Sequence, residues 1–473
     1  MKNIYKILVF SSLIFVTSSC EDIVEGINEN PNDLTVEDVD EGLFLTGGQL
    51  ANIQLQCGHL NRISGMYAGQ LIGIQALYAN IYGYNLTTGE SNSEWTALYV
   101  GVMTNMRHII ENSESNLLRG IAMIIEAHAF GTAASLWGDV PYSEAGNPDI
   151  EDPVFDEQRR VYADVITRLD EGISTLNGAS SSPIAEDIYF EGDKSKWIAA
   201  AHTLKARFYL HQKDYQNALT AAQNGISSAD GDMKFSPGNS VSGDTNLFWT
   251  ILAGSRAGDL GNNADGKDSY LLQILDASNA LSRNHSKTDE TARRAYYTID
   301  ASGSSNLGII EEREPQNMVT YFENKLIMAE AAGRSGGVAA GLVHLNDVRT
   351  WLNSGGNLNE NFDGLSFRYD PFVAADFEAG GIENADGDLT ADDAFLREVM
   401  EERYVSGFGM HMPYNDARRL RKSDANIAVP YFMVDADNSV KPERMPYARN
   451  ELNSNSNAPT EDPGIFTKTE VNQ

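Results

Sequence analysis

The sequence predicts a mainly α protein, in which antiparallel helix pairs form a curved helical body with a loop-rich second layer. Two observations predict this class. Apolar residues recur at helical spacing from about residue 41 to 230 and again over 316–352, whereas 231–315 and 353–473 are rich in Gly, Ser, Asn and Asp. With 473 residues, 42% of them hydrophobic, the chain can bury one large core or two fused ones.

Helical periodicity is clearest in two stripes of apolar residues. The first stripe comprises Leu98, Val102, Met106 and Ile109, and the second Leu117, Ile121, Ile124, Ile125 and His128. Short polar or Gly-containing breaks separate such stripes along the chain. We therefore expect each helix to turn back on the one before it.

One predicted pair has the spacing of a known helical repeat. The helix 196–210 is followed by a polar turn and then by Tyr215, Ala218 and Ala222, spaced Y-x2-A-x3-A. This spacing is tetratricopeptide-like, because small alanines let helices approach closely while the tyrosine wedges the turn between them. A similar pair is expected at 321–334 and 338–352, although no strict 34-residue period, the length of that repeat, runs through the chain.

The first twenty residues have the layout of an export signal. Lys2 and Lys6 precede a mostly apolar run at 7–16, which ends in small residues and Cys20. That run is about half of the ~20 residues that a membrane span needs. We expect residues 1–19 to be removed and Cys20 to carry lipid such as palmitate, with 20–40 as an extended tether and 41–473 as a single domain. Ordinary secretion with an incidental cysteine is the alternative.

Charge and cysteine content restrict the partners and the means of stabilisation. The formal net charge is −32, and removal of a signal that holds two lysines and no acid changes it to −34. Such a surface repels phosphate backbones, so we expect no nucleic-acid partner. Cys57 is the only other cysteine, so with Cys20 lipidated no intramolecular disulfide can form. Cys57 is expected to be a small buried apolar group.

An aromatic segment just before the first clear helix is the leading candidate for a ligand site. Its candidate contacts are Tyr78, Asn80, Tyr82 and Tyr84, because sugar rings pack their C–H faces on flat aromatic rings while hydroxyls find amide partners. The alternative is that these tyrosines cover the helical body. Trp249, in a polar loop region, and Trp95 are further candidates, although Trp95 begins a helical stripe, where a tryptophan more often packs in the core than serves as a platform. Tyr296 and Tyr297 are weaker candidates.

Motifs for catalysis or metal binding are missing from the sequence. The eight histidines lie far apart, with no H-E-x-x-H or C-x2-C, and there is no G-x-S-x-G or P-loop. We expect no enzymatic activity, no metal and no cofactor, although 67 acids always offer carboxylate pairs to a glycosidase hypothesis. The acidic run 384–388 is expected to be a solvated loop, because Ile382 stands where a calcium loop needs its first oxygen ligand.

Seven segments in order resemble the SusD/RagB family of outer-membrane nutrient-binding lipoproteins, and in particular its SusD-like branch. They are 27–32, 136–145 (LWGDVPYSEA), 161–173, 193–207, 321–331, 401–419 and 444–455. Ala448 departs from the family, which usually has proline there, and we interpret it as a local loop change. In addition, Glu21, Asp22 and Glu25 resemble the acidic stretch that sends Bacteroidetes lipoproteins to the outer face of the outer membrane.

The resemblance has implications for function and partners. It implies a lipid-anchored surface protein that binds an oligosaccharide, or alternatively a peptide, and lies as a lid on a SusC-like TonB-dependent transporter. It also implies structural roles for Trp137, Asp139 and Tyr142. Two other classes stay open from the residues alone: a helical scaffold for protein partners without a small ligand, and an outer-surface hydrolase.

Overall fold

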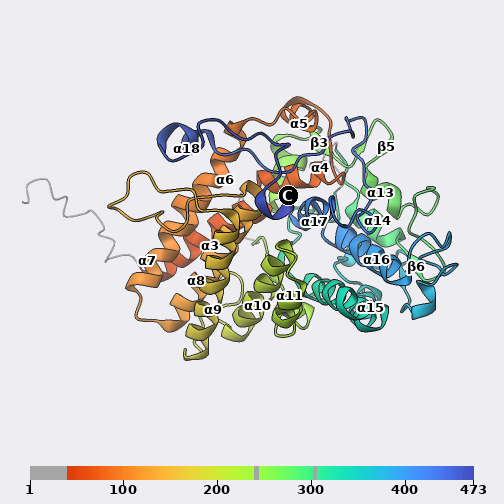
Figure 1. Ribbon diagram of the computed structural model, residues 1–473, viewed down its shortest axis with the longest axis horizontal. Helices are drawn as coiled ribbons and strands as arrows, with labels where there is room; N and C mark the ends of the chain where they lie inside the picture. The colour runs from red at the N-terminus through yellow and green to blue at the C-terminus, as the bar shows by residue number, and fades with distance from the viewer. Residues whose placement is uncertain (1–39, 239–243, 302–305) are drawn as a thin grey trace, which may run out of the picture. The chain divides into compact units, whose positions relative to one another are not determined.

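The computed structural model describes residues 40–238, 244–301 and 306–473 (Figure 1). The predicted signal, Cys20 and nearly all of the tether lie outside the described residues. The chain divides into two units, Met1–Leu43 and Phe44–Gln473, and nearly all of the described residues belong to the second. Its first half holds α3 (Glu41–Cys57, which begins in the first unit), α4 (His59–Tyr67), α5 (Ala76–Tyr82), α6 (Asn92–Thr96), a π-helical turn η3 (Ala97–Met103), α7 (Thr104–Asn112), α8 (Asn116–Trp137), α9 (Gln158–Asn177), α10 (Lys194–His211) and α11 (Tyr215–Ala222).

The second half alternates short elements with three longer helices. Its helices are α12 (Leu247–Trp249), α13 (Tyr270–Leu275), α14 (Thr291–Tyr297), α15 (Tyr321–Asn353), α16 (Ala391–Ser406), α17 (Met412–Leu420) and α18 (Arg449–Ser454). Four two-stranded antiparallel ladders tie the loops together: β1 (Ile72–Gly73) with β3 (Leu260–Gly261), β2 (Met233–Phe235) with β7 (Gln316–Val319), β4 (Asn263–Ala264) with β5 (Lys267–Asp268), and β6 (Thr288–Asp289) with β8 (Arg368–Tyr369). The prediction of a mainly α protein is confirmed.

Helices α8, α9, α10, α11 and α15 follow one another as packed neighbours (Figure 1). Glycines set the closest approach, because a Cβ atom on Gly120 of α8 would lie 2.6 Å from Leu176 of α9. The predicted alanines of α11 are buried, Ala218 at 0% and Ala222 at 1% exposure, in a cluster with Ile327 of α15. Small residues therefore let these helices stack closely, as the repeat spacing predicted.

The helix α15 is a hairpin of two arms. Its backbone leaves the helical region at Gly336 and Gly337, and Gly337 has φ +68°, which favours glycine. Lys325 Nζ lies 2.7 Å from a carboxylate oxygen of Asp347, a contact that a continuous helix would prevent because 22 residues of helix span about 33 Å. The predicted pair 321–334 and 338–352 is thus confirmed.

Three helices, α16, α17 and α18, lie in the region 353–473, which the sequence predicted to be loop-rich, and the first two of them belong to the core. In α16, Phe395, Val399 and Met400 are buried, as is Leu420 at the end of α17. Buried charged residues such as Glu398 stand between these apolar positions, so the apolar periodicity is weak in the sequence. The loop-rich layer therefore surrounds a last pair of core helices.

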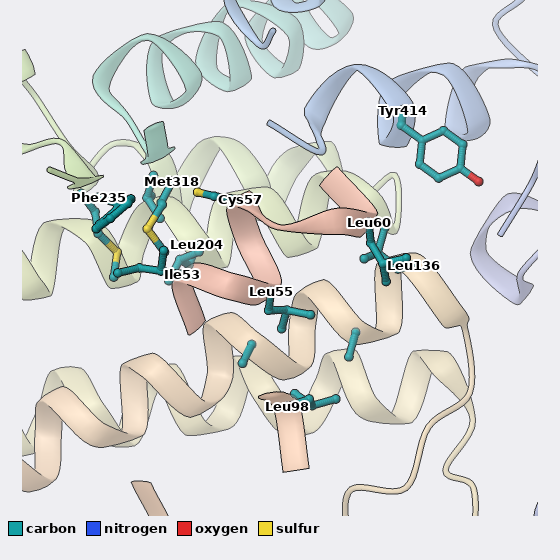
Figure 2. Close-up of a cluster of buried hydrophobic side chains, with 14 of the residues drawn as sticks. Ile53, Leu55, Cys57, Leu60, Leu98, Leu136, Leu204, Phe235, Met318 and Tyr414 are labelled. Carbon is teal, nitrogen blue, oxygen red and sulfur yellow. The ribbon is translucent and has the colours of Figure 1, made fainter. Parts of the chain in front are cut away.

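The main core joins parts of the chain that are far apart in sequence. Figure 2 shows Ile53 and Cys57 of α3 close to Leu204 of α10 and Met318 of β7. Cys57 has no exposure, and burial raises the pKa of its thiol to about 12, so the expected buried apolar role is confirmed. α8 is long and apolar enough to cross a membrane, but 89% of its most apolar stretch is buried inside the fold, as in a core helix.

The segment around Trp137 anchors the end of the chain. Trp137 is fully buried, and its Nε1 donates to the carbonyl oxygen of Pro446 at 2.9 Å. The Tyr447 hydroxyl donates to the carbonyl oxygen of Asp139, also at 2.9 Å. The structural role expected for Trp137 and Asp139 is therefore to hold the residues that precede α18.

A buried network of ion pairs fastens the loop-rich layer to α16. Arg283 and Arg293 come from the loop-rich layer, and Glu398 and Glu402 from α16; all four are less than 9% exposed. Nitrogen and oxygen atoms lie 2.8 Å apart between Arg283 and Glu398 and 2.7 Å apart between Arg293 and Glu402. Glu290 pairs with both arginines, at 2.9 Å from Arg283 and 2.6 Å from Arg293. Buried charges are tolerated only when paired, so this network fixes the relative position of the two layers.

Candidate functional site

Three of the predicted ligand-binding aromatics lie in the core. Tyr78 is 1% exposed and its hydroxyl accepts a hydrogen bond from Arg62 Nε at 2.8 Å. Tyr82 and Trp95 are each 6% exposed, and the Trp95 ring packs edge-on against Trp137, with centroids 5.1 Å apart. Their burial favours the alternative that the sequence left open, in which these rings pack the helical body, and a ligand contact for them stays a prediction.

The other predicted contacts are accessible but are not brought together. Asn80 is exposed on α5, and Trp249 is partly exposed at the end of α12. Tyr84 is partly exposed directly after α5, in a left-handed backbone conformation with φ +68°. The weaker candidates Tyr296 and Tyr297 are buried at 4% and 2% exposure. Among these residues, only Tyr84 borders the groove described next.

A groove with a volume of about 470 Å³ opens between the end of α17 and the segment that follows it. Pockets for small ligands usually measure about 300–1,000 Å³. Its apolar lining consists of Ala417, Ala425, Ala428, Val429, Pro430, Tyr431, Val440 and Phe466, and its polar lining of Arg421, Asn438, Ser439, Lys441 and Glu443. Two other cavities among the described residues, one of them next to His411 and Arg207, each have a volume of about 20 Å³, which is room for roughly one water molecule.

Phe466 presents the accessible aromatic surface of the groove. Its side chain is 47% exposed, and the edge of the Tyr84 ring packs against it with centroids 5.5 Å apart. Tyr431 is only 8% exposed, because Tyr404 stacks on it at 6.4 Å and Lys441 Nζ lies 3.7 Å from its ring centroid. A sugar ring can thus stack on Phe466, whereas Tyr431 forms the floor.

Two of the predicted tyrosines hold the segment 433–441, whose residues 438–441 form one wall of the groove. The Tyr82 hydroxyl donates to the carbonyl oxygen of Val434 at 2.9 Å, and the Tyr84 hydroxyl donates to that of Asp437. Within the wall, the Asn438 amide donates to the Met433 carbonyl oxygen and accepts from the Met433 N–H, both at 2.8 Å. The wall is therefore shaped before any ligand arrives. The tyrosine segment therefore positions this wall through Tyr82 and Tyr84.

The groove is lined by more positively charged than negatively charged side chains. Arg421, directly after α17, pairs with Glu443 at 2.5 Å, and its Nη2 donates to the Tyr431 hydroxyl at 3.3 Å. Lys441 Nζ donates to the Tyr431 carbonyl oxygen at 2.7 Å. Burial, with a smaller contribution from Arg421, lowers the pKa of the Lys441 ammonium to about 8. The groove therefore combines one neutralised ion pair with one further cation.

Sequence reasoning missed the residues that form this groove. The run Pro430 to Met433 is apolar and aromatic, and Phe466 stands alone in a polar tail, but neither pattern differs from that of ordinary packing. No group of three or more His, Cys, Asp or Glu side chains is arranged to hold a metal ion in the part of the chain that the structure describes.

Comparison with known proteins finds a family model that matches part of the chain. Residues 31–236 match a family model, SusD-like, described as starch-binding and associating with the outer membrane. No curated protein matches the sequence.

Solved structures extend the likeness beyond that segment. A SusD/RagB family protein of Bacteroides thetaiotaomicron matches at a TM-score of 0.63 and 19% identity, over 89% of this chain and 95% of its own. A chitin-binding SusD homolog of Flavobacterium johnsoniae matches at 0.63 and 16%, over 92% and 98%. A SusD homolog of Bacteroides uniformis matches at 0.63 and 18%, over 92% and 100%. The family model thus matches residues 31–236, and the described chain has the fold of SusD/RagB proteins, which confirms the resemblance found in the sequence.

Proposed function

We propose that this chain is a lipoprotein on the outer face of the outer membrane, which binds a glycan oligomer without changing it chemically and delivers it to a SusC-like TonB-dependent transporter. The observation that carries the proposal is the preformed groove with the accessible Phe466 ring. The family description, starch-binding at the outer membrane, and a chitin-binding structural neighbour support a glycan as the ligand.

The carboxylates of the groove support binding without catalysis. A glycosidase needs two carboxylates that flank the scissile bond. The groove is lined by one carboxylate, that of Glu443, and it is engaged by Arg421 at 2.5 Å. A paired carboxylate is a poor general base, because its charged form is already stabilised.

Replacing Phe466 with alanine is expected to weaken glycan binding about 10- to 100-fold, because burial of a phenyl ring contributes about 1.5–3 kcal/mol. Isothermal titration calorimetry of the mature chain with starch-type, chitin-type and acidic oligosaccharides and with short peptides measures the change. Leu281→Ala is the control, since Leu281 is 45% exposed and does not line the groove. A ligand that binds the wild type and Phe466→Ala equally would move the site away from the groove. If nothing in the panel binds, the proposed function fails, and capture of a peptide alone would replace the glycan.

The lipid anchor is tested separately from ligand binding. We expect radiolabelled palmitate to be incorporated in cells by the wild type and by Cys57→Ala, but not by Cys20→Ala, since Cys57 is fully buried and the signal layout ends at Cys20. Protease treatment of intact cells should digest the labelled protein if it faces the exterior. A mature chain that is unlabelled and free in the periplasm would contradict the anchor.

A further inference from the structure

Lys441 is a cation without an anionic partner in the groove. Its Nζ uses one of three N–H donors, on the Tyr431 carbonyl oxygen at 2.7 Å. Within residues 40–238, 244–301 and 306–473, no ion pair joins it to a carboxylate. A partly buried ammonium is unfavourable unless it is paired, since burial removes its hydration. The groove therefore has an unfilled position for an anion.

The charged and titratable groups around Lys441 leave that position open. Arg421, at the end of α17, is neutralised by Glu443. Asp437, on the facing wall, accepts the hydroxyl and the N–H of Ser439, which lowers its pKa and directs its carboxylate to its own loop. The hydroxyls of Tyr84 and Tyr431 are uncharged at neutral pH, because burial raises the pKa of both. Among the residues that line the groove, Lys441 therefore holds the charge that has no opposite partner.

This local positive charge contrasts with the formal net charge of the whole chain, which is −32. A long polyanion would meet repulsion over most of the surface, whereas a single acidic group on a short oligomer would meet the Lys441 ammonium. At physiological salt, charges more than about 8 Å away are largely screened, so the nearest cation decides the interaction.

We propose that the groove selects a glycan that carries a carboxylate, with a uronic acid group on Lys441 Nζ and a sugar ring on Phe466. This inference rests on the proposed function and adds the chemical class of the ligand. A uronic acid provides both features at once, because its carboxylate is attached directly to a pyranose ring. The Tyr431 ring below the ammonium holds Lys441 in place for this contact.

The probes are trimers of galacturonic, glucuronic and mannuronic acid, each compared with the neutral trimer of the corresponding hexose. We expect at least one acidic trimer to bind about 10- to 100-fold more tightly than its neutral counterpart at pH 7, as for a charge-assisted hydrogen bond. Lys441→Met should remove this preference, so that the acidic and the neutral trimer bind with equal affinity. Lys422→Met is the matched control, because Lys422 is exposed and lies outside the groove lining.

A pH series provides a second measurement. Lys441 is charged below about pH 8 and loses its proton above it. Binding of the acidic trimer should therefore weaken by about tenfold between pH 7 and pH 9.5 in the wild type, whereas in Lys441→Arg, which stays protonated over this range, it should not change.

The outcomes separate the two proposals. If acidic and neutral trimers bind equally and Phe466→Ala weakens both, the groove is the site but the carboxylate preference is overturned. Binding of an acidic tripeptide but of none of the trimers also overturns it. If neither the acidic nor the neutral glycans bind, the proposed function itself is contradicted.

Discussion

Replacing Glu402 with alanine is expected to lower the free energy of unfolding by about 3–5 kcal/mol, the usual cost of leaving a buried ionic partner unpaired. Burial alone would raise the pKa of Glu402, but Arg293 and Arg283 hold it well below its usual range. The carboxylate lies 2.7 Å from Arg293 and 3.0 Å from Arg283 and accepts the Ser406 hydroxyl at 2.5 Å. Its removal takes away the oxygen atoms that accept N–H groups of two buried guanidinium groups.

Chemical denaturation followed by circular dichroism measures this loss. The comparison is Glu171→Ala, which removes an ion pair with Arg168 at 3.0 Å that is partly open to solvent and should cost less than about 1 kcal/mol. Hydrogen exchange should also accelerate over 281–297 in Glu402→Ala, since these residues depend on the network for their attachment to α16. Equal stability of the two variants would show that the network does not fasten the layers.

The helical body could be predicted from the sequence because its determinants are local. The stripe of Leu98, Val102, Met106 and Ile109 is buried, as its spacing predicted. The alanines of the repeat-like pair lie in a cluster with Ile327 of α15, and Tyr215 packs against the same cluster with Arg334 of α15 4.3 Å above its ring. Spacings of three and four residues report directly on which side of a helix is buried.

The groove could not be predicted because its determinants are distant in sequence. Tyr84 and Asp437 are 353 residues apart, yet a hydrogen bond joins them. In the same way, the burial of Tyr78 depends on Arg62, on a different helix. A tyrosine in a polar segment therefore has the same sequence pattern whether its ring faces solvent or the core. Only the packing of remote segments distinguishes a platform from a positioning residue.

Acidification provides the second large effect, through the buried His411. Its ring nitrogens lie 2.9 Å from the Ser64 hydroxyl and 3.2 Å from the Leu55 carbonyl oxygen. Burial lowers its pKa from 6.5 to about 4, so the imidazole is neutral in the folded chain at pH 5 while that of the unfolded chain is charged. The contribution of the neutral His411 to the free energy of unfolding is thus fully present above pH 6.5 and is lost as the pH falls towards 4. One pH unit corresponds to 1.36 kcal/mol, so the total loss is about 3 kcal/mol.

Denaturation midpoints at pH 7.5, 6.5, 5.5 and 4.5 test this dependence. Burial also lowers the pKa of His128 and His211 well below the ordinary value, so both histidines should steepen the loss in the same direction. His411→Gln should make the decline between pH 6.5 and 4.5 shallower, because glutamine has no proton to gain in this range. His108→Gln, at a partly exposed histidine, serves as the control.

Carboxylates in ion pairs affect stability in a lower pH range. Burial would raise the pKa of Asp416, but Arg403 and Arg419 hold it below its usual value, so the protein loses stability through this group only below about pH 4. A steep decline already at pH 5.5 must therefore come from the histidines. Stability that stays constant down to pH 4.5 would mean that His411 is protonated without cost in the folded chain.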